Sequence, residues 1–210
     1  MSIINGFSIG LLLDPKTEGI VRGFWKSLHD MGMNQFFYNL GTVPHIPAVA
    51  VDESFEEGIH SACQKLAKKT KAFTLSFELA AMFTTKPSSV IWMPTPTLNL
   101  LKLQEALHAA MEPFSTFPPQ GYYLPKRWMP HVGLASRVGD KAFLPSIVKS
   151  ALVFPSLHRA IVRAIGVFSY QPLDLICTYP LLDDPSLQVR EPSNIEMDSE
   201  YFEYYKQEDY

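Results

Sequence analysis

Two histidines in matching segments are the residues of this chain best suited to carry chemistry. His45 stands in the segment PHIPAVA and His131 in PHVGLAS, so each follows a proline and precedes apolar and small residues. An imidazole has an unperturbed pKa of about 6.5, so both of its protonation states are available at neutral pH. A facing pair could cleave a phosphodiester without a metal: one ring takes a proton from the attacking hydroxyl or water while the other protonates the leaving oxygen.

Each histidine is predicted to lie on a strand. Residues 36–51 have strand character around His45, and residues 128–138 have it around His131. Ahead of both, the compact apolar run at 7–14 predicts a buried central strand. The histidines would then be held by sheet backbone rather than by mobile loops.

The elements around the two histidines follow the same order in each half of the chain. In about residues 7–86, and again in 87–182, a strand is followed by a helix, the histidine strand, a second helix and a last strand. Thr17 is expected to cap the first helix. Two halves folded alike about a pseudo-twofold axis would place the histidines on either side of one cleft. Because strands and helices alternate in many proteins, a chance placement of two of the six histidines on strands is the competing interpretation.

The strand around His131 also predicts an anion site. Side chains two residues apart share one face of a strand, so His131, Gly133 and Arg137 face the same way, and extending the strand backwards adds Arg127. Two guanidinium groups beside a histidine could clamp a phosphate. Tyr123, in the preceding loop, could stack on a base or donate its hydroxyl. For the arginines a solvated surface position, and for the tyrosine a packing role, are the alternatives.

The two PH-x-x-(L/V) segments, the passage FELAAMF…SVIWMPTPTLNLLKLQEALHAAM between them, and HVGLASR resemble the 2H phosphoesterase superfamily, the group of the so-called 2′-5′ RNA ligases and cyclic nucleotide phosphodiesterases. The resemblance runs from about residue 7 to residue 182. It implies a bilobal, pseudo-twofold α+β fold in which antiparallel sheets line a central cleft with helices outside. It also implies hydrolysis of 2′,3′-cyclic phosphates on RNA ends or small nucleotides, or of 2′-5′ linkages, with His45 and His131 as the catalytic pair and with no metal or cofactor.

The chain departs from the family motif, H-x-(T/S), at its third position in both segments. Those positions hold Pro47 and Gly133, so both of the hydroxyls that hold the phosphate in the family are missing. A hydrogen bond to a charged group contributes about 1.5 to 3 kcal/mol, so two losses could lower the rate by roughly two to four powers of ten. Gly133 could leave its space to a water. The alternative function is therefore a non-catalytic module that binds a nucleotide or RNA end.

Composition excludes several other classes. With 18 Lys and Arg against 21 Asp and Glu, the net charge of −3 provides no broad basic surface for duplex nucleic acid. Cys63 and Cys177 are predicted to be reduced thiols, and the four closely spaced ligands of a zinc site are missing. Asp14 interrupts the first apolar run before it could span a bilayer. We therefore expect a cytoplasmic monomer without a membrane segment.

The last stretch of the chain differs from the rest in composition. Residues 1–185 form the predicted phosphoesterase-like domain, whereas residues 186–210 are rich in acidic residues and tyrosine and poor in aliphatic ones. Such a segment is predicted to be a flexible or loosely docked tail. It either keeps the protein soluble or binds a partner, and in the second case the folded domain would serve as its scaffold.

Overall fold

The computed structural model describes residues 6–52, 56–83, 88–114, 123–139, 141–151, 158–169 and 173–184. The strands are β1 (Gly6–Leu13), β2 (His45–Asp52), β3 (Phe73–Phe83), β4 (Ser89–Pro94), β5 (Val132–Ala135), β6 (His158–Ser169) and β7 (Leu175–Pro180). The helices are α1 (Pro15–Asp30), α2 (Phe36–Leu40), α3 (Glu56–Ala67), α4 (Leu98–Met111) and α5 (Leu144–Ala151), with 3₁₀ turns η2 (Glu112–Phe114) and η3 (Lys141–Phe143). The predicted tail at 186–210 lies outside the described residues.

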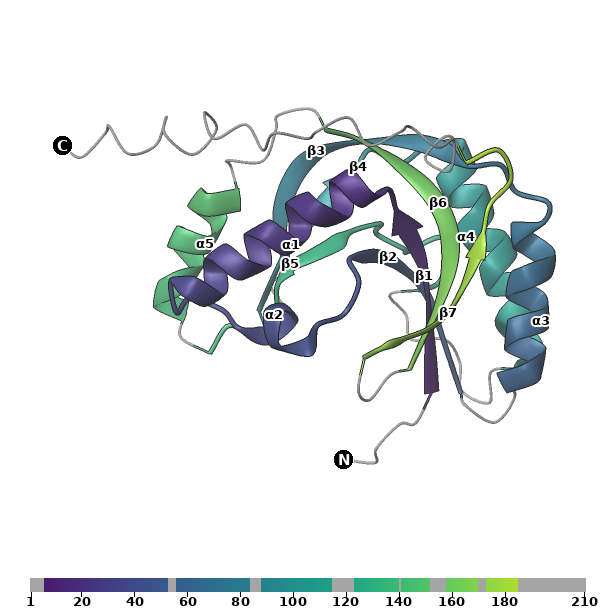
Figure 1. Ribbon diagram of the computed structural model, residues 1–210, viewed down its shortest axis with the longest axis horizontal. Coiled ribbons are helices and arrows are strands. Elements are labelled where there is room, and N and C mark those ends of the chain that lie inside the picture. Colours follow the sequence, from purple (N-terminus) through teal and green to yellow (C-terminus); the bar gives the residue numbers. More distant parts are fainter. Residues whose placement is uncertain are drawn as a thin grey trace, which may run out of the picture.

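All described strands join one antiparallel sheet in the order β2-β1-β6-β3-β4-β5, and β7 pairs with β6 as well. The sheet bends so that its two edge strands, β2 and β5, approach each other in the middle of the molecule (Figure 1). They do not pair, so the sheet stays open. The indole N–H of Trp128 donates to the Pro47 carbonyl across the gap, at 2.9 Å. The predicted α+β class with an antiparallel sheet is confirmed.

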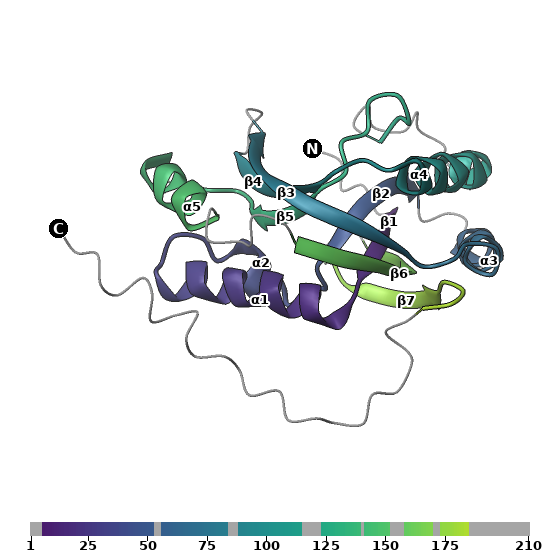
Figure 2. The same cartoon turned by 90° about the horizontal axis from the view of Figure 1, so that it is seen from above.

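Four of the five described helices cover the sheet in two groups. Helices α3 and α4 pack together beside β2, β6 and β7, while α1 and α2 pack together against β5 on the other side of the molecule (Figures 1 and 2). The two halves of the chain interleave, because β3 of the first half pairs with β4 and β6 of the second. Among the described helices, none combines the length and apolar character needed to cross a bilayer.

Strand β1 is central, as its apolar run predicts, and all eight of its residues are buried. The helix that follows starts one turn earlier than expected, because Asp14 is the N-cap and its carboxylate accepts a hydrogen bond from the Thr17 N–H at 3.0 Å. Pro15 at the first helical position suits this start, since its missing N–H would have no partner there. The expectation that Thr17 is the cap is therefore wrong.

The predicted strand segments around the histidines are shorter than their pattern indicates. Residues 36–40 form helix α2, which ends at Gly41 in a left-handed conformation, and the strand begins only at His45. In the second segment the strand runs over Val132–Ala135, so His131 directly precedes it. Both histidines thus lie at the start of a strand rather than within one. Cys63 and Cys177 are free thiols.

Candidate functional site

The ring of His45 is fixed on three sides. Its Nδ1 lies 2.8 Å from the Val43 carbonyl, which can only accept a hydrogen bond, so Nδ1 carries the proton. The ring stacks on Phe168 with centroids 4.0 Å apart. It also covers Gly10, where an added Cβ would lie 2.6 Å from the ring. The neutral ring therefore keeps the lone pair on Nε2.

His131 repeats the same hydrogen-bond arrangement on the opposite edge of the sheet. Its Nδ1 lies 2.7 Å from the Met129 carbonyl, again two residues upstream, so its neutral form also keeps the lone pair on Nε2. Phe83, at the end of β3, meets the ring edge-on with centroids 5.1 Å apart. Both imidazoles are thus oriented by backbone and aromatic contacts.

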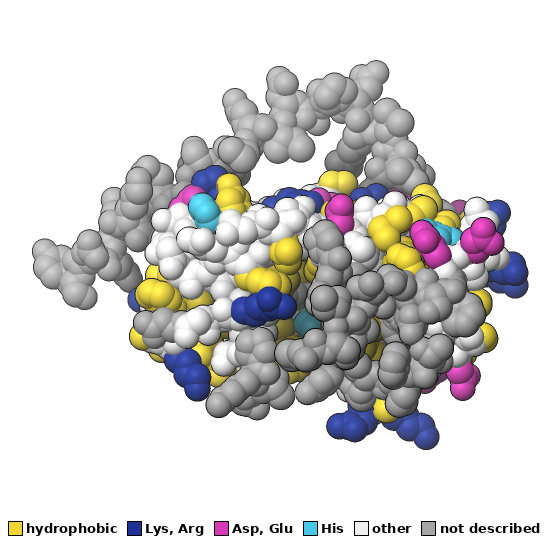
Figure 3. Space-filling view, turned by 90° about the horizontal axis from the view of Figure 1, so that it is seen from below, with side chains coloured by type: hydrophobic (Ala, Val, Ile, Leu, Met, Phe, Trp, Pro, Cys, Tyr) yellow, Lys and Arg dark blue, Asp and Glu magenta, His cyan; other side chains and the backbone are white. Residues whose placement is uncertain are grey.

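One open cavity of about 260 Å³ is lined by both histidines. Tyr123 and Arg137 line it as well, as do the aromatic residues Trp25, Phe36 and Phe37 and the hydroxyl residues Ser8 and Thr42. Figure 3 shows a histidine side chain set back in a hollow of this face, beside hydrophobic side chains and a basic one. The curvature of the sheet has brought together two imidazoles that are far apart in sequence.

Burial keeps both rings neutral in the free protein. Desolvation lowers the pKa of His45 to about 4; the bond to the Val43 carbonyl opposes this shift and the nearby His131 adds to it. Desolvation also lowers the pKa of His131, against the opposing effect of its bond to Met129. At neutral pH each Nε2 is therefore a proton acceptor, and a bound anion would favour the protonated form of either ring.

The depressed pKa of His45 predicts a loss of stability in acid. As pH falls from about 6.5 towards 4, the unfolded chain binds a proton that the folded ring resists, so the free energy of unfolding falls, by ~2–3 kcal/mol from this group. In a His45→Phe variant, urea unfolding at several pH values should show a shallower fall over this range. If the free energy of unfolding depends on pH equally in the variant and in wild type, the lowered pKa of His45 is contradicted.

The two positions that carry hydroxyls in the family motif are occupied differently here. The Pro47 carbonyl accepts the Trp128 indole N–H, and the Gly133 carbonyl accepts that of Trp25 at 3.0 Å. Phe37 fills the space beside Gly133, where an added Cβ would lie 2.4 Å from the ring. The expectation that a water could occupy this space is wrong, because an aromatic ring does.

Restoring the family hydroxyl at Gly133 should therefore destabilise the protein. In Gly133→Ser the new side chain must displace Phe37, and overpacking of this kind costs about 1 to 3 kcal/mol. In the double variant with Phe37→Ala, the serine should lower the free energy of unfolding by less than it does alone. A double-mutant cycle from urea denaturation measures this coupling. If the two changes in unfolding free energy simply add, the Phe37 ring moves aside without cost and the prediction is wrong.

Two further residues predicted from the sequence line the cavity, and one does not. Arg137 lies beyond the end of β5 in a left-handed backbone conformation (φ 52°), and its guanidinium lies 4.8 Å from the Phe36 ring centroid. Tyr123 lines the cavity while its carbonyl accepts from Gln104. Arg127 is exposed, and its N–H donates to the Leu124 carbonyl in a turn. That turn breaks the register that placed Arg127 beside His131.

Sequence reasoning missed Ser8 and Thr42. Ser8 is the one polar side chain in the run GFSIGLLL, which is a signal that was available in the sequence. Thr42 stands in the short connection between α2 and β2 and carries no such signal. Within the described ranges, no three His, Cys, Asp or Glu side chains gather in a group suited to a metal ion.

Comparison with known proteins identifies the family. A model of the 2′-5′ RNA ligase superfamily matches residues 38–172, more than half of the chain. Among solved structures, TT0787 of Thermus thermophilus has a TM-score of 0.54 at 12% identity, covering 84% of this chain and 97% of that one. E. coli LigT complexed with NADP+ has a TM-score of 0.53 at 14% identity, covering 86% of this chain and 99% of that one. LigT has also been solved with 3′-AMP.

These structural likenesses show the fold, and no curated protein sequence matches the chain. The superfamily match carries the family assignment, because it includes both histidine segments. The resemblance of the two segments predicted the same group. The chain belongs to the 2′-5′ RNA ligase superfamily of 2H phosphoesterases.

Proposed function

We propose that this protein hydrolyses a cyclic phosphodiester, on a 2′,3′-cyclic phosphate RNA end or a small nucleotide, or a 2′-5′ linkage, by acid and base catalysis from two histidines. The observation that carries the proposal is the shared arrangement of His45 and His131. Both line one cavity, and both use Nδ1 to bind the carbonyl two residues upstream. Each ring therefore offers Nε2 for proton transfer, in a fixed tautomer and orientation.

The mechanism assigns one proton transfer to each ring. In hydrolysis, the neutral Nε2 of His45 takes a proton from the water that attacks phosphorus, and its low pKa keeps that nitrogen unprotonated beforehand. His131, protonated as the anionic substrate binds, gives its proton from Nε2 to the leaving ribose oxygen. The phosphorus–oxygen bond to that leaving oxygen breaks as the bond to water forms. The rings exchange roles in the reverse direction.

Two side chains are proposed to hold the substrate. The guanidinium of Arg137 lies at the cavity and would offset the charge of the phosphate. Tyr123 would stack on a base or donate its hydroxyl to the substrate. A nucleotide is the ligand class we propose, because LigT, which has the same fold, has been solved with NADP+ and with 3′-AMP.

A substrate panel tests the proposal. The purified protein is incubated with 2′,3′-cyclic nucleotides, cyclic-phosphate RNA ends, 2′-5′ oligoadenylates and cyclic oligonucleotides, with chelator present throughout. Turnover of at least one class is expected. Tight nucleotide binding by calorimetry without turnover of any class would instead favour the non-catalytic module, which the two missing hydroxyls at Pro47 and Gly133 make the second candidate.

A further inference from the structure

Ser8 is a buried hydroxyl residue on the cavity side of β1. The strand register pairs Leu12 with His45 and Gly10 with Pro47, so Ser8, two residues along from Gly10, shares the face of these residues. The residue is 4% exposed and lines the cavity. No described residue gives its hydroxyl a hydrogen bond. Ser8 thus lies on the strand next to that of Pro47, where the family motif has its hydroxyl, and is paired there with Ala50.

Thr42 is a second hydroxyl residue without a partner at the same cavity. It is 2% exposed, and within the described part of the chain its Oγ1 has no hydrogen-bond partner. Thr17 provides the contrast, because it is also fully buried but its hydroxyl bonds both Asp14 and His158, each at 2.8 Å. Of these two buried threonines, therefore, only Thr17 has its hydroxyl paired by a described residue.

An unpaired buried hydroxyl costs free energy, so buried polar groups in folded proteins nearly always have partners. The Thr42 hydroxyl is such a group, and Ser8 places a second hydroxyl at the same cavity, beside two imidazoles, so we infer that a polar ligand binds both. A phosphate has the acceptor oxygens to do so. Its charge would also be met by Arg137, which lines the same cavity.

We propose that Ser8 and Thr42 donate hydrogen bonds to the non-bridging oxygens of the substrate phosphate, in place of the two motif hydroxyls that this chain lacks. This inference rests on the proposed function, since it assigns the phosphate contacts of that same site. Ser8 reaches the phosphate from the floor of the cavity. The Thr42 oxygen is covered in the free protein, so its side chain turns about the Cα–Cβ bond when the phosphate binds.

The test compares stability with phosphate affinity in four variants. Ser8→Ala and Thr42→Val remove a hydroxyl, Thr42→Ser keeps it, and Thr17→Val removes a paired one. Calorimetry with inorganic phosphate should show about 10- to 100-fold weaker binding in Ser8→Ala and in Thr42→Val. The Tm of both should be unchanged or raised. Thr42→Ser should bind within about 3-fold of wild type, and Thr17→Val should lower Tm while its folded form keeps its affinity.

The outcomes separate this inference from the function on which it rests. If wild type binds phosphate and cleaves a panel substrate but Ser8→Ala and Thr42→Val bind equally well, the two hydroxyls are not the donors and the proposed function stands. If Thr42→Val lowers Tm as much as Thr17→Val does, the Thr42 hydroxyl has a structural partner and its assignment is overturned. A wild type that neither binds phosphate nor cleaves any substrate would overturn the proposed function itself.

Discussion

Replacing His45 or His131 with alanine should lower kcat on the best panel substrate by about 10²- to 10⁴-fold, the usual contribution of a positioned acid or base. Each ring is held by a carbonyl and an aromatic contact, and under the proposed mechanism each transfers one proton, so the loss should appear in kcat. Because the two rings act in one step, the double variant should be little worse than the poorer single one. Initial rates at saturating substrate measure the effect.

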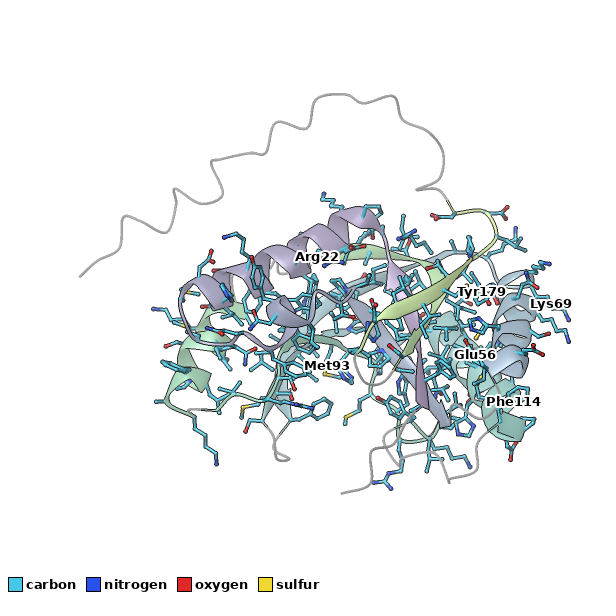
Figure 4. The ribbon with its side chains drawn as sticks, turned by 60° about the horizontal axis from the view of Figure 1, so that its bottom comes forward. Arg22, Glu56, Lys69, Met93, Phe114 and Tyr179 are labelled. Carbon is cyan, nitrogen blue, oxygen red and sulfur yellow. The ribbon has the colours of Figure 1, made fainter. Side chains whose placement is uncertain are left out.

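His60→Ala is the matched control for these variants. His60 is also half-buried and hydrogen-bonded, with its Nδ1 2.6 Å from the Tyr179 hydroxyl, but it lies on α3. Figure 4 shows Tyr179 and Glu56, its two polar neighbours, on the side of the molecule opposite Arg22 of α1. The activity of the His60→Ala variant should match that of wild type. Full activity in the His45/His131 double variant would remove the basis for acid and base catalysis at this cavity.

Replacing Asp14 with alanine should lower the free energy of unfolding by about 3 kcal/mol, because it removes an N-cap and several charge-assisted hydrogen bonds together. The carboxylate accepts from the Thr17 N–H, the Thr17 hydroxyl and the Ile161 N–H, so it joins α1 to β6. Burial raises the pKa of Asp14, but these hydrogen bonds outweigh burial and the pKa lies below its ordinary value. Urea denaturation at pH 7 gives the change.

Asp30→Ala is the comparison for this prediction. Asp30 lies at the far end of α1 and is paired with Lys26 in solvent, where an ion pair contributes little. Its removal should leave the urea midpoint nearly unchanged. The Asp14 effect should also shrink below about pH 4, since the carboxyl favours folding only while it is ionised, and the folded protein keeps it ionised to lower pH than the unfolded chain does. If Asp14→Ala lowers the free energy of unfolding equally at all pH values, the effect comes from packing instead.

The parts of the fold set by local pattern could be predicted from the sequence. The apolar run of β1 and the helix after it follow from spacing and residue type, whereas only part of each histidine segment forms the predicted strand. The cap of that helix was expected at Thr17, whereas Asp14 is the N-cap and its carboxylate also accepts the Ile161 N–H of β6. This helix start is therefore joined to a strand far away in the sequence, which local spacing does not reveal.

The parts of the site that depend on packing could not be predicted. Strand alternation places Arg127 and Arg137 on the His131 face, but a turn carries Arg127 away, whereas Arg137, beyond the end of β5, lines the cavity. Phe37 of α2 fills the space beside Gly133 of β5, which no spacing rule reveals. The curvature that brings β2 to β5 is a property of the whole sheet.

The indole N–H of Trp128 joins the two unpaired edges of the sheet, because it runs from the segment ahead of β5 to the backbone of β2. His45 lies two residues from the Pro47 end of this hydrogen bond, and His131 lies three residues from its Trp128 end. The bond therefore ties together the two edges of the sheet that carry the imidazoles. Under the proposed mechanism, a substrate would meet both rings already at one cavity.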